Sequence, residues 1–97
     1  MRVRIEVSSA ASRAESGFAA RVHLSRDAMV EVRFRTSTGR VVQVLSPQQA
    51  RQGVNLIRWD LRDRLGRMVP RGNYLIEVVA VTDENQVGRG VKALRVR

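Results

Sequence analysis

Two aspartates three positions apart, Asp60 and Asp63, form the acidic pair best placed to do chemistry. Paired carboxylates can bind calcium or share general acid and base roles. A calcium site, however, needs several converging oxygens and few positive neighbours, and four arginines flank this pair. They are Arg58, Arg62, Arg64 and Arg67. We therefore expect the two carboxylates to cap turns and to form ion pairs.

The other residues with catalytic or ligating chemistry are isolated. Asp83 and Glu84 could ligate a metal, but a polar hairpin turn accounts for them. His23 is the single histidine and is expected on the outer face of its strand, without a second ligand or a nucleophile. The two glycines of residues 88–92 lack the spacing and the strand-to-helix context of a phosphate loop. The chain also has no cysteine. The sequence therefore predicts a protein that is not an enzyme and has no catalytic residue, cofactor or metal.

The strong positive charge raises a different class of function. The formal net charge is +9, which favours nucleic acid or an acidic polysaccharide as a partner. Seven arginines are expected to point outward: Arg2, Arg4, Arg21, Arg33, Arg35, Arg95 and Arg97. If their strands are neighbours, they would form one basic sheet face. The alternative is a solvated face on which they pair across strands with Glu6, Glu31 and Glu77, and we favour it because aromatic residues for stacking are few.

Alternation with a period of two dominates the chain and predicts the elements that carry these residues. Expected strands cover 3–7, 18–24, 30–35, 40–45, 54–61, 73–82 and 90–97. The stretches 8–17 and 46–53 are expected to be loops, the second because it contains Pro47 and Gly53. Seven short strands within 97 residues predict one domain, 1–97, folded as an all-β, antiparallel immunoglobulin- or fibronectin-III-like sandwich.

The segment from Trp59 to Tyr74 is expected to hold this sandwich together. Trp59 is a large anchor between the sheets, and the hydroxyl of Tyr74 is expected to return to a backbone group at the strand corner. Asp60 and Asp63 start a tight connection that Gly66 closes. Pro70 and Gly72 form a second turn back into the sheet. These seven are the structural residues that the sequence singles out.

This part of the chain resembles the Ig-like domain of the bacterial flagellar hook-capping protein, the FlgD Ig-like family. The matching residues are Gly39-Arg40, Val42, Leu45, Gly53, Trp59-Asp60, Arg62-Asp63, Gly66-Arg67, Val69-Pro70, Gly72 and Tyr74. The sequence departs from the family pattern at Leu61, where members commonly have glycine. A leucine enters positive φ only at a cost, so the turn geometry after Asp60 is in question.

The resemblance implies a β-sandwich without catalytic residues. It also implies export, either to a flagellar hook cap or as a module of a cell-surface or secreted protein. The partners would then be proteins: copies of the chain or other domains of its parent. No apolar run is long enough to cross a bilayer, and the alternating residues 1–10 do not form a signal peptide. The chain would contact these partners through its strand edges and sheet faces. If the partner is a copy of the chain, this contact is self-assembly.

Overall fold

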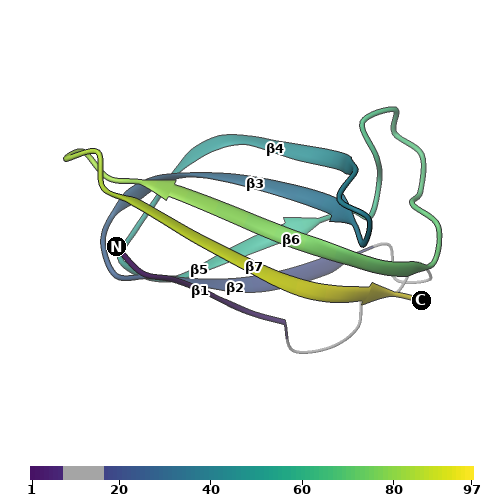
Figure 1. Ribbon diagram of the computed structural model, residues 1–97, viewed down its shortest axis with the longest axis horizontal. Coiled ribbons are helices and arrows are strands. Elements are labelled where there is room, and N and C mark those ends of the chain that lie inside the picture. Colours follow the sequence, from purple (N-terminus) through teal and green to yellow (C-terminus); the bar gives the residue numbers. More distant parts are fainter. Residues whose placement is uncertain (8–16) are drawn as a thin grey trace.

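The computed structural model describes residues 1–7 and 17–97, which form seven strands in two antiparallel sheets and no helix (Figure 1). The strands are β1 (Val3–Glu6), β2 (Phe18–Leu24), β3 (Ala28–Thr36), β4 (Val41–Ala50), β5 (Gly53–Trp59), β6 (Gly72–Val81) and β7 (Val87–Val96). One sheet has the order β1-β2-β5 and the other the order β4-β3-β6-β7. The predicted antiparallel sandwich is confirmed. Apart from Gly17, the loop expected over 8–17 lies outside the described residues.

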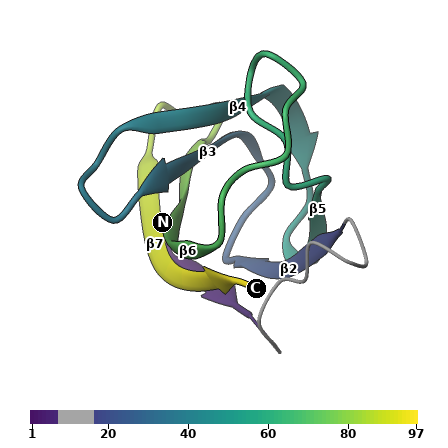
Figure 2. The same cartoon turned by 90° about the vertical axis from the view of Figure 1, so that its right-hand side faces the viewer.

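The core lies between the two sheets, as the end-on view in Figure 2 shows. Each strand sends alternate side chains inward, which is the pattern that the sequence predicted. On β6, for example, Tyr74, Ile76, Val78 and Ala80 are all buried. β6 lies between β3 and β7, and of the apolar residues on its outer face Leu75 and Val79 are half-buried and Val81 is exposed. In the described part of the chain, no helix could cross a lipid bilayer.

β4 is longer than the sequence indicated, and the loop expected over 46–53 is wrong except at residues 51 and 52, because Gly53 already begins β5. The strand continues through Pro47 to Ala50. A shift in register between Val30 and Val32 of β3 leaves Pro47 outside the paired positions. Because β4 is an edge strand and Pro47 falls at this bulge, its missing N–H removes no bond from the sheet.

The segment between β5 and β6 covers the side of the sandwich where the two sheets diverge. In Figure 2 it rises beside β4. The backbone N–H of Arg64 donates to the carbonyl of Val42 on β4, over 3.1 Å. Leu61 and Val69, from the two ends of this segment, are 0 % and 1 % exposed. The segment is therefore part of the folded core and not a free loop.

Candidate functional site

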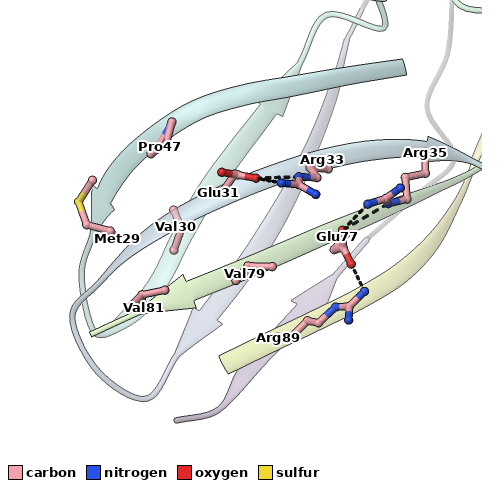
Figure 3. A pocket seen from close by; sticks show the side chains of 10 residues that line it. All are labelled: Met29, Val30, Glu31, Arg33, Arg35, Pro47, Glu77, Val79, Val81 and Arg89. Carbon is pink, nitrogen blue, oxygen red and sulfur yellow. Dashed lines mark hydrogen bonds and ion pairs between the residues drawn. The ribbon is translucent and has the colours of Figure 1, made fainter. Parts of the chain in front are cut away.

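The outer face of the four-stranded sheet carries a groove of about 560 Å³ where β3 begins and β6 ends. Ten residues line it: Met29, Val30, Glu31, Arg33, Arg35, Pro47, Glu77, Val79, Val81 and Arg89. Figure 3 shows that Arg33, Arg35, Glu77 and Arg89 gather at one end of the groove, while Met29 and Val81 lie at the opposite end. The groove thus has an aliphatic end and a charged end.

Glu77 organises the charged end. It lies on the outer face of the central strand β6, yet it is 4 % exposed, because two arginines cover it. Arg35 donates from Nε and Nη2 to Glu77 Oε1, over 3.3 and 3.2 Å, and Arg89 donates to Oε2. Burial raises the pKa of Glu77, but the hydrogen bonds and charges of Arg89 and Arg35 outweigh burial and leave this pKa below its ordinary value.

The rest of the groove is aliphatic or already paired. Arg33 lies 2.6 Å from Glu31 on the same strand, so these two charges neutralise each other locally. Met29 and Val81 are 44 % and 37 % exposed, which is unusual for neighbouring large apolar side chains. An aliphatic floor bordered by paired charges can bury the apolar side chains of another protein. It offers no general base or nucleophile to a small substrate.

Trp59 and Tyr74 lie in the core, on the sheet side opposite the groove. Trp59 is 2 % exposed and stacks on Phe34, with ring centroids 4.1 Å apart. It meets Tyr74 edge-on at 6.0 Å. Its indole N–H donates to the carbonyl of Arg62 over 3.0 Å, and the Tyr74 hydroxyl donates to the carbonyl of Pro70 over 2.6 Å. The two aromatic residues thus anchor both ends of the 60–71 segment to the core.

The two aspartates of this segment bind backbone N–H groups. Asp60 Oδ1 accepts from the N–H of Arg62 over 3.0 Å. Asp63 Oδ1 accepts from the N–H groups of Leu65 and Arg67, over 2.9 and 3.0 Å. The bond from Arg67 is the main cause that holds the pKa of Asp63 below its ordinary value. Such contacts stabilise a turn and leave few free oxygens for a metal.

Leu61 resolves the question of turn geometry after Asp60. Its φ is +62°, in the left-handed region, and its side chain is 0 % exposed. The chain therefore keeps the backbone turn that glycine would favour, and burial of the leucine offsets the strain. Gly66, at φ +79°, closes the turn that Asp63 begins, and Gly72, at φ +148°, starts β6.

The seven arginines do not form one basic face, so that part of the sequence interpretation is corrected. Arg2, Arg4 and Arg21 lie on or beside the three-stranded sheet, whereas Arg33, Arg35, Arg95 and Arg97 lie on or beside the four-stranded sheet. The reason is pairing order: β1 pairs with β2, whereas β7 pairs with β6. Alternation predicts which face a residue occupies but not which strands are neighbours.

All three glutamates pair with arginines, but only Glu77 does so across strands, with Arg35 and Arg89. Glu6 and Glu31 pair with an arginine of their own strand. Glu6 lies 3.1 Å from Arg4 and 2.8 Å from His23 Nε2. Arg4 donates to His23 Nδ1 over 3.4 Å, which matches a histidine that carries its hydrogen on Nε2. Among residues 1–7 and 17–97, no group of three or more His, Cys, Asp or Glu residues could hold a metal.

The turn between β6 and β7 needs no ligand to explain it. The N–H of Thr82 donates to the carbonyl of Gln86, and the N–H of Asn85 to the carbonyl of Thr82. Arg26 bonds to Glu84 and Gln86 at 3.5 and 2.8 Å. Asp83 is exposed within this turn.

The groove itself was missed by the reading of the sequence. Val81 falls within the expected strand 73–82, whereas Met29 and Arg89 lie just outside the expected strands 30–35 and 90–97. One signal was present: Glu77 is the only charge in the apolar run of β6. A lone carboxylate in a central strand requires partners, and those partners mark the groove.

The FlgD Ig-like domain family matches residues 6–84 of the chain. No curated protein sequence gives a match. Among solved structures, the chain is similar to FlgD from P. aeruginosa, with 23% identity and a TM-score of 0.75 over 96% of this chain and 71% of that one. FlgD from Xanthomonas campestris, described in connection with hook capping and flagellar assembly, has 18% identity and a TM-score of 0.73, covering 96% of this chain and 68% of that chain.

A third similar structure is the dimeric latent PorU from Porphyromonas gingivalis, at 22% identity and a TM-score of 0.75. The match covers 97% of this chain but only 9% of PorU, so the likeness is to one small part of that protein. At such identities the likeness to all three structures shows a shared fold.

Proposed function

The chain belongs to the FlgD Ig-like domain family, and we propose that it is a non-enzymatic structural module of an exported bacterial protein of the cell-surface, secreted or hook-cap type. The module works by contact with other proteins. Family membership and the FlgD fold support this proposal, together with the pairing of the carboxylates at the candidate site with arginines or backbone N–H groups.

The observation that carries the proposal is the aliphatic end of the groove. Met29 and Val81 remain 44 % and 37 % exposed beside Val79 and Pro47, on a rigid three-strand surface. Burial of such side chains yields about 25 cal/mol per Å² of apolar area, and this gain favours a protein partner over water. The paired charges at the other end would set the orientation of that partner more than its affinity.

A basic module for nucleic acid or acidic polysaccharide is the alternative. It predicts affinity that falls steeply and linearly with salt on a log–log plot, because each phosphate contact releases counterions. The division of the arginines between two sheets, and their pairing with Glu6, Glu31 and Glu77, favours the protein-contact proposal over this alternative.

The test places a photo-crosslinking amino acid at Val81, in the parent protein of the source bacterium. The matched control carries it at Leu65, which is 75 % exposed on the 60–71 segment away from the groove. We expect discrete, protease-sensitive adducts from position 81 and not from position 65. Adducts that nuclease removes would overturn the proposal, and so would an equal yield of adducts at both positions.

A further inference from the structure

Two of the four edge strands cover each other. β1 and β7 are edges of different sheets, but they pack closely together (Figure 1). A Cβ atom added at Gly88 would lie 2.6 Å from Cγ of Met1, and one added at Gly90 would lie 3.1 Å from Cγ1 of Val3. Because β1 is fixed between β2 and β7, it is not free to add to another sheet.

β4 is protected in another way. Pro47 lies in a bulge of β4 that interrupts one half of the strand, and both features discourage pairing with a new strand. The 60–71 segment occupies the other half. Arg64 donates its backbone N–H to Val42, and the side-chain amide of Gln43 donates to the carbonyls of Arg62 and Asp63 over 3.2 Å each.

In the described part of the chain, β5 has no proline, bulge or packed strand of this kind. The side chain of Asn55 bonds to the backbone of Arg51 and Gly53 at the start of the strand. β5 pairs with β2 in unbroken register over all seven of its residues. The described residues place no other strand on its second edge, and no backbone–backbone bond outside the sheet involves β5. The strand contains no proline, and two aliphatic side chains on its outer face, Val54 and Leu56, are 61 % and 51 % exposed. An edge of this kind is a template for a further strand.

The charges around β5 determine which kind of strand could add to its edge. Arg58 lies on β5, and Arg21 is the cross-strand partner of Leu56. The nearby carboxylates are occupied: Glu6 pairs with Arg4 and His23, and Asp60 caps the N–H of Arg62. A second copy of the chain would bring another net charge of +9 to this edge, which opposes self-pairing.

We propose that the free edge of β5 binds an extended peptide segment of a partner protein that carries an acidic residue and two aliphatic residues at every second position, all on one face. The peptide adds as a further antiparallel strand of the three-stranded sheet. Val54, Leu56 and Arg58 share the outer face of β5, so the two aliphatic side chains contact Val54 and Leu56 and the carboxylate lies near Arg58. Backbone hydrogen bonds supply affinity, and the side-chain pattern supplies selectivity. This surface is on the opposite sheet from the groove, so the inference is independent of the proposed docking at the groove.

The experiment titrates the chain into a fluorescein-labelled, end-capped peptide, Thr-Glu-Thr-Val-Thr-Val-Thr, and follows anisotropy; its glutamate and two valines fall on one face of an added antiparallel strand, opposite Arg58, Leu56 and Val54. The key variant is Leu56→Lys, with Val87→Lys as its control, since Val87 is a strand residue of the other sheet that is 62 % exposed. Both variants add one positive charge, which by itself would strengthen the binding of an acidic peptide. We expect Leu56→Lys to weaken binding by about tenfold or more, whereas Val87→Lys leaves it within about twofold.

Amide hydrogen exchange supplies the second readout. Binding should slow exchange at backbone amides of β5 and not of β4, because only β5 gains hydrogen-bond partners. A peptide with lysine in place of glutamate should not bind. The proposal is wrong if Leu56→Lys binds as tightly as the parent, or if the peptide binds without protecting β5. It is also wrong if light scattering of the parent chain alone shows a dimer that Leu56→Lys dissociates, since a second copy would then be the occupant.

Discussion

Replacement of Leu61 tests whether the turn after β5 is strained and held by burial. Leu61 has a φ of +62° and is 0 % exposed, and its carbonyl accepts from the N–H of Val69 over 2.8 Å. Truncation to alanine removes the buried side chain but keeps the left-handed backbone. We expect Leu61→Ala to lower the free energy of unfolding by about 2–5 kcal/mol, the usual range for a buried leucine.

Leu61→Gly separates the two effects. Glycine relieves left-handed strain of about 1–2 kcal/mol, and its freer unfolded chain costs about 0.4–1 kcal/mol. The difference leaves Leu61→Gly more stable than Leu61→Ala by about 0.8 kcal/mol at the middle of these ranges, and by about 1.6 kcal/mol at most. This order is the reverse of the one expected at an ordinary position, where glycine is the less stable replacement.

Urea unfolding of the parent and both variants, fitted with a shared m-value, measures this difference. Val69 is the control, because it is 1 % exposed in the same segment and has no positive φ. There, Val69→Gly should be less stable than Val69→Ala by about 0.4–1 kcal/mol. If Leu61→Gly proved less stable than Leu61→Ala, the strain argument would fail. If neither variant lost stability, the buried position of Leu61 would be wrong.

Three further predictions concern the core and the groove. Trp59→Ala should lower the free energy of unfolding by about 3–5 kcal/mol, because it removes the ring that stacks on the core; coincident urea melts of variant and parent would contradict this. Tyr74→Phe should cost about 0.5–1.5 kcal/mol, because it removes the hydroxyl that donates to the Pro70 carbonyl, and a loss as large as that of Trp59→Ala would show that the ring had moved. The lowered pKa of Glu77 means that its carboxylate contributes stability above about pH 4.5, the ordinary value for a glutamate, and loses it as the pH falls through the lowered pKa. Glu77→Gln should therefore be destabilised at pH 7 and approach the parent in acid, as pH-dependent urea melts would show; a constant difference at every pH would refute the charge argument.

The alternation of the sequence was enough to predict the sandwich and most of its core. Tyr74 and Val78 could be placed on the inner face of their strand because every residue on that face is apolar, whereas a charged residue interrupts the other face. The same reasoning failed at Pro47, since a bulge on an edge strand accepts a proline that a central strand would reject. A local pattern reports what a strand prefers and not where the strand lies in its sheet.

The candidate site was harder to predict for the same reason. Arg35 and Arg89 are far apart in the sequence, and they converge on Glu77 only because β6 lies between β3 and β7. A leucine in a sequence does not indicate a positive φ, because leucine rarely adopts one, so the φ of Leu61 could not be predicted from its residue type. Only the resemblance to a family with glycine at that position raised the question.

The distribution of protection over the sheet edges links the fold to the proposed function. If stability were the only requirement, we would expect the edge of β5 to be protected as the edge of β4 is, because a free strand edge promotes aggregation. The chain instead places the capped segment after Asp60 against β4 and leaves Val54 and Leu56 exposed beside arginines. The rigid anchors around Trp59 then hold the free edge in place, so that a partner strand meets an edge that is already ordered. Such an edge costs little entropy to bind, which is the physical advantage of a structural module over a flexible segment.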